Sequence, residues 1–241
     1  MSDIMHETET TGDNNVSNVS IYEGLCLFDS EIKTKIIICN VLECTPEEFD
    51  YLLFSGYRKF AFRFFRYICD CDLCSSIRIL VNEYSPSDTH RRLLKKNKDL
   101  TVMTIPIRYR KTHYYLYKKH HLSRGFKVLD EALFIQEFYF SPIEALITEI
   151  YDNGILIGLG FLDVGAVCLS SVYFVYDPSY CKRSLGMFSI VKEIELAASM
   201  KKTLYCLGLY CKGRQFLSYK DKFSPYESLD YNTGIWKRNE T

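Results

Sequence analysis

The sequence predicts an α+β fold, and three stretches of the chain carry that prediction. Residues 45–56 (TPEEFDYLLFSG) have a helix signature, with a residue that can cap the start and a glycine at the end. From residue 144 the chain holds three apolar runs separated by turn residues, which is typical of antiparallel strands. Residues 186–202 then place apolar side chains at helical spacing, and 203–211 form a further apolar run.

The N-terminal part begins with residues 1–20, which are polar and mildly acidic and are expected to form a disordered tail. In the helix that follows, Thr45 can cap the first turn and Pro46 suits the first helical position. Gly56 is expected to end this helix.

The middle of the chain is expected to contain one strand and two basic helices. Residues 77–84 (IRILVNEY) predict a strand, and the turn signal at 85–88 closes it. A helix then begins near Asp88 or Thr89, and residues 111–124 (KTHYYLYKKHHLSR) predict a basic, aromatic helix.

The C-terminal part predicts a β-rich core. Asn153-Gly154 is the hairpin dipeptide between the first two apolar runs, and a second turn lies near 163–165. Ile190 and Ile194 mark the apolar face of the helix that follows. Strand, hairpin, long strand, glycine-led helix and strand is the plan of the GNAT-type acyltransferase core. We therefore expect a GNAT-like acyltransferase domain over 96–241, preceded by a cysteine-containing α/β domain over 21–95.

Cysteine content and the missing leader indicate the compartment. The chain has ten cysteines, yet residues 1–20 show no basic segment followed by an apolar core, so no secretory signal is expected. The longest apolar stretches, such as 155–162, are too short to span a membrane. We expect a cytoplasmic protein whose cysteines are reduced thiols or metal ligands.

Charge is unevenly distributed along the chain. From Arg91 to Arg124 there are eleven Lys or Arg residues and a single acid, Asp99, although the formal net charge is zero. Such a stretch favours a phosphate-bearing partner. The alternative is a solvated, charged helix surface.

Two segments of the chain resemble known enzymes. They are 57–97, beginning GYRKFAFRFFRY and containing CDCDLC, and 176–227, containing YDPSYCKRSLG and LGLYCKGRQFLSYKDKFSPYE. Together they resemble the bacterial aspartate/glutamate leucyltransferases and the eukaryotic arginyltransferases, over about Cys26 to Trp236. The resemblance implies transfer of leucine or arginine from charged tRNA to an N-terminal Asp or Glu of a protein, which creates a degradation signal.

The resemblance also implies where substrates bind. The Tyr176-Asp177-Pro178 and Arg183-Ser184-Leu185-Gly186 segments match the family, so Asp177, Arg183, Ser184 and Gly186 are expected near the terminal adenosine of tRNA. Matching residues near the C-terminus are Tyr210 and Lys220, expected to donate to a carbonyl or phosphate, and Glu227, expected to read a free amine.

The basic stretch supplies the remaining candidates. Arg91, Arg92, Lys95 and Lys96 are expected to bind the tRNA backbone. An acidic acceptor side chain must be paired with a cation, and Arg91 or Arg92 is expected to serve it.

The cysteines between 69 and 74 form a candidate metal knuckle. Cys69-x-Cys71-x2-Cys74 can aim thiolates at one ion, and the resemblance adds Cys26 as an N-terminal ligand. Zinc and an iron–sulfur cluster both take four thiolates, so the spacing leaves both open. The alternative is that these cysteines are ordinary small apolar residues.

The reaction needs no covalent nucleophile, because an aminoacyl ester is already activated. The enzyme must position an α-amine with a pKa of about 8 and stabilise an oxyanion. Coenzyme A is not expected, because the Arg-x-x-Gly loop lacks the second small residue of that site. The alternatives left open are a coenzyme-A-dependent N-acetyltransferase and a non-catalytic RNA-binding relative.

Overall fold

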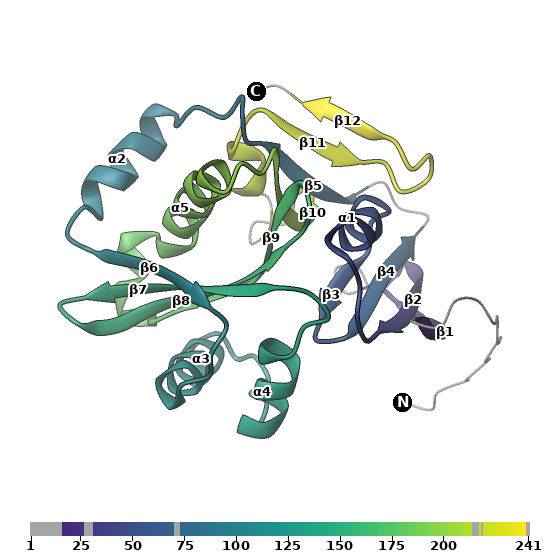
Figure 1. Cartoon of the computed structure of the whole chain (residues 1–241), viewed down its shortest axis with the longest axis horizontal. Coiled ribbons are helices and arrows are strands. Elements are labelled where there is room, and N and C mark those ends of the chain that lie inside the picture. The colour runs from purple at the N-terminus through teal and green to yellow at the C-terminus, as the bar shows by residue number, and fades with distance from the viewer. Residues whose placement is uncertain (1–15, 27–30, 70–72, 214–216, 218, 240–241) are drawn as a thin grey trace.

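A computed structural model describes residues 16–26, 31–69, 73–213, 217 and 219–239, with the backbone alone at 16–18 and 69. These residues form two β-sheets, with helices packed against each (Figure 1). The α-helices are α1 (Pro46–Phe54), α2 (Asp88–Lys96), α3 (Lys111–Ser123), α4 (Glu131–Tyr139) and α5 (Leu185–Ser199). The strands are β1 (Val16–Leu25), β2 (Lys33–Val41), β3 (Arg58–Phe60), β4 (Arg63–Cys69), β5 (Cys74–Leu80), β6 (Thr101–Pro106), β7 (Ala145–Asp152), β8 (Ile155–Val164), β9 (Cys168–Tyr176), β10 (Leu204–Cys211), β11 (Tyr226–Leu229) and β12 (Trp236–Asn239). Short 3-10 helices are η1 (Pro178–Arg183) and η2 (Tyr219–Lys222).

The N-terminal sheet has four strands in the order β1-β2-β4-β3. Helix α1 covers it, with Phe49 and Leu53 buried against Phe64. Thr45 caps α1 as predicted: its hydroxyl accepts from the Glu48 amide at 3.2 Å, and the Glu48 carboxylate accepts from the Thr45 amide at 2.7 Å. This reciprocal pair satisfies two donors of the first turn and fixes where the helix begins.

The larger sheet has eight strands in the order β12-β11-β5-β10-β9-β8-β7-β6. Strands β9 and β10 are parallel and pair only over three residues each, 168–170 with 204–206. Beyond that point β9 stays with β8, while β10 continues along β5. The two central strands therefore diverge and open a fork in the sheet. This order and the following helix confirm the predicted GNAT-like core.

Helices cover both faces of this sheet (Figure 1). Helix α5 packs on one face through Ile190, Val191 and Ile194, and α2 lies beside it. Helices α3 and α4 cover the other face, where Tyr117 and Phe134 are fully buried. The helices predicted at 111–124 and 186–202 are confirmed as α3 and α5.

Several boundaries differ from the sequence expectations. Strand β5 begins three residues before the predicted 77–84 strand and ends at Leu80, because the chain then turns. Ser87, not Asp88 or Thr89, caps α2, since its hydroxyl accepts from the amide of His90. Strand β1 begins at Val16, inside the 1–20 range expected to be a tail, because it pairs with β2.

The predicted N-terminal domain, residues 21–95, includes segments that belong to the larger sheet and its helices. Strand β5 pairs with β10 and β11 of the large sheet, and α2 packs against α5. The sheets therefore part between β4 and β5. Among the described residues, no helix combines the length and the apolar character needed to cross a membrane.

Candidate active site

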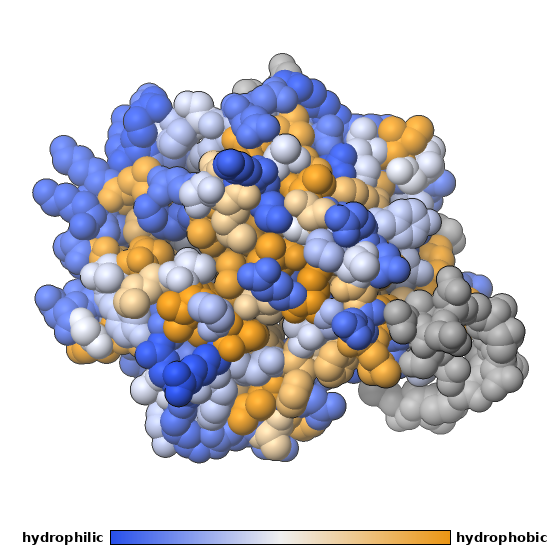
Figure 2. Space-filling model, in the orientation of Figure 1, coloured by the Kyte–Doolittle hydropathy of each residue, from blue (hydrophilic) through white to orange (hydrophobic). Residues whose placement is uncertain are grey.

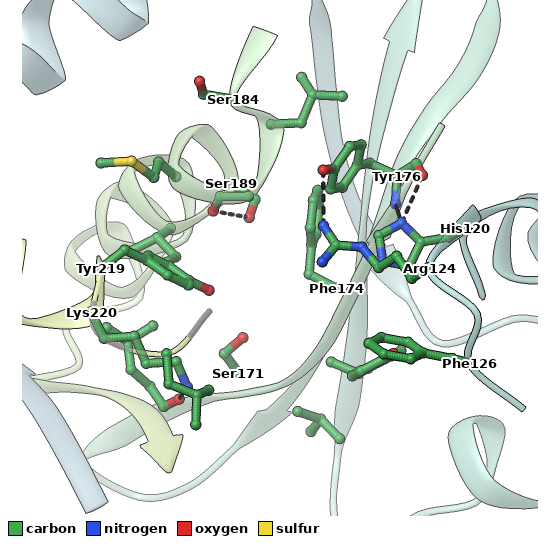
Figure 3. A pocket seen from close by; sticks show the side chains of 18 of the residues that line it. His120, Arg124, Phe126, Ser171, Phe174, Tyr176, Ser184, Ser189, Tyr219 and Lys220 are labelled. Carbon is green, nitrogen blue, oxygen red and sulfur yellow. Dashed lines mark hydrogen bonds between the residues drawn. The ribbon is translucent and has the colours of Figure 1, made fainter. Parts of the chain in front are cut away.

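A cavity of about 500 Å³ opens at the fork between β9 and β10 (Figure 3). The start of α5 forms one wall, the splayed half of β9 and the end of α3 form another, and the segment around η2 closes it. The described lining residues are Arg58, His120, Arg124, Phe126, Ser171, Val172, Tyr173, Phe174, Tyr176, Ser184, Leu185, Gly186, Met187, Ser189, Ile190, Leu207, Leu217, Tyr219 and Lys220.

The N-terminus of α5 opens directly into this cavity. Ser184 precedes it in the left-handed conformation (φ 53°, ψ 45°) and gives no side-chain cap. A Cβ added at Gly186 would meet nothing within 4 Å, so the backbone there is open to a ligand. The amides of Met187 and Phe188 donate to the Ser184 carbonyl, which leaves those of Leu185 and Gly186 without an intrahelical acceptor, and the helix dipole adds partial positive charge. The wall is thus suited to an anion.

The loop that leads to α5 is tied to the helices on either side of it. Lys119 of α3 contacts the Asp177 carboxylate at 2.7 Å, and Asp177 also accepts from the Ser179 amide at 2.9 Å. On the other side, Arg183 makes two hydrogen bonds of 2.8 Å to Asp99. Asn97 donates to the Arg183 carbonyl at 3.0 Å. Residues beyond α2 and within α3 therefore position the loop together.

At the fork itself the floor is cationic. Lys220 donates to the carbonyls of Leu207 and Leu209 at 2.8 and 2.7 Å. Between those carbonyls lies Gly208, with φ +72°, where the register of β10 shifts. The guanidinium of Arg58 fills the space of a Cβ at Gly208. Burial lowers the pKa of Lys220 well below its ordinary value, and the nearby Arg58 charge adds to this.

The opposite wall carries a neutral imidazole and a second guanidinium (Figure 3). His120 Nδ1 lies 2.9 Å from the carbonyl oxygen and 3.2 Å from the amide nitrogen of Tyr176. Burial lowers the pKa of His120, which keeps the ring uncharged at neutral pH. Arg124 is exposed, donates to the Tyr176 hydroxyl at 3.0 Å and lies over its ring. Across the cavity, the Tyr219 hydroxyl points inward.

One carboxyl lies just beneath the lining. Glu193 projects from the buried face of α5, accepts from the Tyr205 hydroxyl, and has one oxygen without a hydrogen-bond partner. Burial raises the pKa of Glu193 to about 7, so this group gains or loses its proton near neutral pH. Glu193 itself is fully enclosed and does not line the cavity.

The charge of the described lining is one-sided. It includes the basic residues Arg58, Arg124 and Lys220, beside the neutral His120, and no Asp or Glu. Such a cavity disfavours a cationic ligand, because a buried cation needs a carboxylate partner. It favours ligands that bring negative charge of their own.

The structure brings together part of the predicted site. Ser184, Gly186 and Lys220 line the cavity, while Asp177 and Arg183 lie in the loop that leads to it. The four cations of α2 lie outside the cavity on the exposed surface of that helix: Arg91, Arg92, Lys95 and Lys96. Of these, Arg91 pairs with Asp88 on the same helix, and Lys96 donates to the Lys182 carbonyl.

Tyr210 and Glu227 are not among the residues that line this cavity, and the roles predicted for them stay predictions. Tyr210 donates to Asp221 at 3.1 Å and lines a separate hollow beside β11 and β12. Glu227 pairs with Arg78 at 2.7 Å. The Arg78 guanidinium also lies over the Trp236 ring, 4.0 Å from its centroid. Register places Glu227 opposite Arg78 across β11 and β5, so its carboxylate has a structural partner.

Two of the four predicted metal ligands, Cys26 and Cys74, are described, and they lie on different sheets. Cys26 follows β1 and Cys74 begins β5, and both are half-buried. Cys71 and the side chain of Cys69 lie outside the described residues. Within the described part of the chain, no group of three or more His, Cys, Asp or Glu side chains could hold a metal ion. Metal binding therefore stays a prediction.

Sequence reasoning missed several residues that the fold brings to the cavity. Arg58 and Ser171 are 113 residues apart in the sequence, on different strands, and only the tertiary structure brings them into contact. His120 and Arg124 were seen only as members of a basic stretch. A signal for Glu193 did exist, since it falls on the apolar stripe of α5 between Ile190 and Ala197.

Comparisons with known proteins give a consistent picture. Residues 112–230 match the family model described as arginine-tRNA-protein transferase, C terminus. The chain is 32% identical over 217 residues to an aspartate/glutamate leucyltransferase of Campylobacter jejuni, covering 86% of this chain and 90% of that protein. It is 34% identical over 198 residues to the protein of that name from Alkalilimnicola ehrlichii, covering 80% and 82%.

Among solved structures, similarity is weaker. The crystal structure of FemX matches with a TM-score of 0.48 and 10% identity, over 59% of this chain and 54% of that one. The C-terminal domain of a putative lysylphosphatidylglycerol synthetase from Agrobacterium fabrum matches with a TM-score of 0.47 and 10% identity, over 67% and 50%.

Proposed function

Because the chain belongs to the arginyl-tRNA–protein transferase family, we propose that it transfers leucine from charged tRNA to proteins that begin with Asp or Glu. We place this reaction in the cytoplasm, where charged tRNA is made. The observation that carries the proposal is the cavity: an uncapped helix N-terminus opens into a cationic fork whose described lining has no carboxylate.

The composition of the cavity favours leucine over arginine as the donor. Its described lining includes Leu185, Met187, Ile190 and Leu207, which suit an aliphatic side chain. An arginyl group would bring a guanidinium among existing cations with no carboxylate to pair it. Leucine avoids this cost.

The tRNA end is proposed to lie on α5. The phosphate of the terminal adenosine would accept hydrogen bonds from the amides of Leu185 and Gly186, while exposed Arg124 adds positive charge from the opposite wall. The ester would then extend toward the fork between β9 and β10, where Ser171 and Tyr219 face the cavity.

Transfer itself requires little chemistry from the protein. The α-amine of the acceptor attacks the ester carbonyl, the bond to the ribose oxygen breaks, the amine loses one proton, and the ribose oxygen leaves with one proton as a hydroxyl. Neutral His120 lines the cavity and can accept that proton. The Tyr219 hydroxyl can donate to the developing oxyanion, the role that the sequence had suggested for Tyr210. Most of the rate enhancement then comes from positioning.

The body of the tRNA is proposed to lie across α2 and α3. Hydrophilic surface covers the region of α2 (Figure 2), and Arg92, Lys95 and Lys118 are exposed there and on α3. Both helices contact the loop that leads to α5, through Lys96–Lys182 and Lys119–Asp177. Cations on either side of the loop could guide the acceptor stem toward the cavity.

One experiment tests the activity. The purified protein is incubated with total charged tRNA carrying labelled leucine or arginine, and with peptides that begin with Asp, Glu, Asn or Ala. We expect leucine on the Asp and Glu peptides and little arginine on any. Parallel reactions with acetyl-coenzyme A test the rival acetyltransferase, since the helix N-terminus could also hold a pyrophosphate. Binding of tRNA with no transfer at all would leave a non-catalytic RNA-binding protein.

A further inference from the structure

Arg58 reaches from the small sheet into the fork of the large one. It belongs to β3, yet its Nη2 donates to the Ser171 carbonyl of β9 at 3.4 Å. Its Nη1 lies 0.8 Å from where a Cβ on Gly208 of β10 would be. The guanidinium therefore lies between the two diverging strands and lines the cavity.

This guanidinium makes no ion pair in the described part of the chain, although the Asp163 carboxylate, which pairs with Lys59, acts on it at longer range. No ion pair there includes Arg58, and its Nη1 is buried without a hydrogen-bond partner. Its neighbour Lys59, by contrast, pairs with Asp163 at 3.2 Å. Burial lowers the pKa of Arg58, which reflects the cost of an unpaired charge. A buried cation left unpaired is expensive, so a ligand that supplies the anion would be bound strongly there.

The other basic side chains of the cavity already donate hydrogen bonds within the protein or lie away from the fork. Lys220 donates to two carbonyls of β10, and Arg124 lies at the opposite wall on the Tyr176 hydroxyl. Arg91, one of the two cations expected to serve the acceptor, pairs with Asp88 on the outer surface of α2. Among the described cations at the fork, Arg58 thus has a nitrogen, Nη1, that donates no hydrogen bond.

We propose that Arg58 binds the side-chain carboxylate of the acceptor's N-terminal Asp or Glu and thereby determines acceptor specificity. This inference rests on the proposed function. The phosphate of the tRNA has its own site at the start of α5, whereas the fork is where amine and ester meet. The carboxylate of Asp or Glu lies only one or two carbons from the Cα that bears the reacting amine. The planar guanidinium fork matches a carboxylate better than it matches an amide.

The test compares acceptors rather than overall activity. Peptides that begin with Asp, Glu, Asn and Gln are assayed with leucyl-tRNA and the wild type, Arg58→Met and Arg58→Lys. We expect Arg58→Met to lower kcat/KM for the Asp peptide about 100-fold, as when a buried charge pair loses one partner. The Asn peptide should change less than about twofold, and Arg58→Lys should retain part of the preference for Asp. Arg63→Gln is the matched control, because Arg63 lies on the next strand, β4, and forms an exposed pair with Glu137 of α4.

The outcomes separate this inference from the proposed function. A wild type that transfers leucine to no acceptor overturns the function itself. A wild type that prefers Asp, together with an Arg58→Met variant that keeps the same Asp-to-Asn ratio, overturns the role of Arg58. An equal loss with Asp and Asn peptides also overturns it and assigns Arg58 to the oxyanion or to stability.

A second measurement does not depend on the variants folding. Phenylglyoxal modifies accessible arginines of the wild type, and mass spectrometry reports modification at Arg58. An Asp-initiated peptide should protect Arg58 at concentrations where the Asn-initiated peptide does not. Equal protection by the two peptides, or none by either, contradicts carboxylate binding.

Discussion

Arg183 and Asp99 form a two-pronged ion pair, with both nitrogen–oxygen distances at 2.8 Å. Asp99 is the single acid in the basic stretch from Arg91 to Arg124, and its pKa is lowered mainly because Arg183 donates to it. The pair joins the segment after α2 to the residue that precedes Ser184. It therefore helps to orient the N-terminus of α5, and binding of the tRNA end by Arg183 stays a prediction.

Breaking this pair should impair transfer more than folding. Asp99→Asn and Arg183→Gln are each expected to lower kcat/KM for leucyl-tRNA by roughly threefold to tenfold, because the loop loses a fixed position. Exposed pairs contribute little to stability, so the melting temperature should hardly change. The double variant should be no worse than either single one. Independent, multiplying losses would show that the residues act separately.

The exposed cations of α2 and α3 should contribute to tRNA affinity through counterion release. Replacing Arg92, Lys95, Lys98 and Lys118 by Ala should weaken binding and reduce the slope of log K against log salt by up to about 3. Lys201→Ala and Lys212→Ala, exposed lysines on other parts of the surface, are the control. The measurement is tRNA affinity between 50 and 200 mM salt. An unchanged slope in the four-site variant would show that these cations form a solvated helix surface and do not contact tRNA.

Gly208 should tolerate no side chain, because Arg58 occupies the space. At φ +72° a Cβ is already strained, and it would lie 0.8 Å from Nη1 of Arg58. Gly208→Ala should therefore reduce stability and displace the guanidinium, with loss of transfer to Asp peptides. Gly213→Ala separates the two effects, since Gly213 has φ +77° and nothing within 4 Å of its Cβ position. Its cost should be backbone strain alone, roughly 1 kcal/mol, as measured by urea unfolding. Equal losses of stability in the Gly208→Ala and Gly213→Ala variants would show that contact with Arg58 adds nothing to the backbone strain.

Local patterns predicted the helices α1, α2, α3 and α5 and the strands β5 and β7 to β10, but not α4, β6, β11 or β12. Caps, turn dipeptides and periodicity are properties of short segments, which is why they could be recognised. The Thr45 cap and the Asn153-Gly154 turn act within a few residues, and their structures agree with prediction. The contact between Arg58 and the Ser171 carbonyl depends instead on how the two sheets meet, so no local sequence pattern predicts it. Glu227 shows the converse: a charged residue in a matching motif proved to face Arg78 across two strands.

Metal binding by the cysteine knuckle is expected to stabilise the junction between the sheets. Cys26 and Cys74 flank it, and Cys71 and Cys69 are the other predicted ligands. Protein purified without oxygen should contain zinc or iron in stoichiometric amount, and Cys71→Ser or Cys74→Ser should remove it. Cys181→Ser is the control, because Cys181 is exposed in η1 and belongs to no such group. A folded wild type that holds neither metal would disprove the site.

Glu193 should make stability depend on pH in the range below neutrality. Its pKa is raised by burial from 4.5 to about 7, so the folded state keeps a proton that the unfolded chain has lost. The associated stability is fully present below pH 4.5 and falls as the pH rises to about 7. The loss is about 3 kcal/mol for a shift of this size.

Glu193→Gln keeps the neutral form at every pH, so its free energy of unfolding should decline less than that of the wild type between pH 4.5 and 7. Glu195→Gln is the control, since Glu195 is exposed on the same helix and pairs with Lys192. Urea unfolding across this range measures the difference, and parallel curves for wild type and Glu193→Gln would mean that Glu193 is ionised inside the fold.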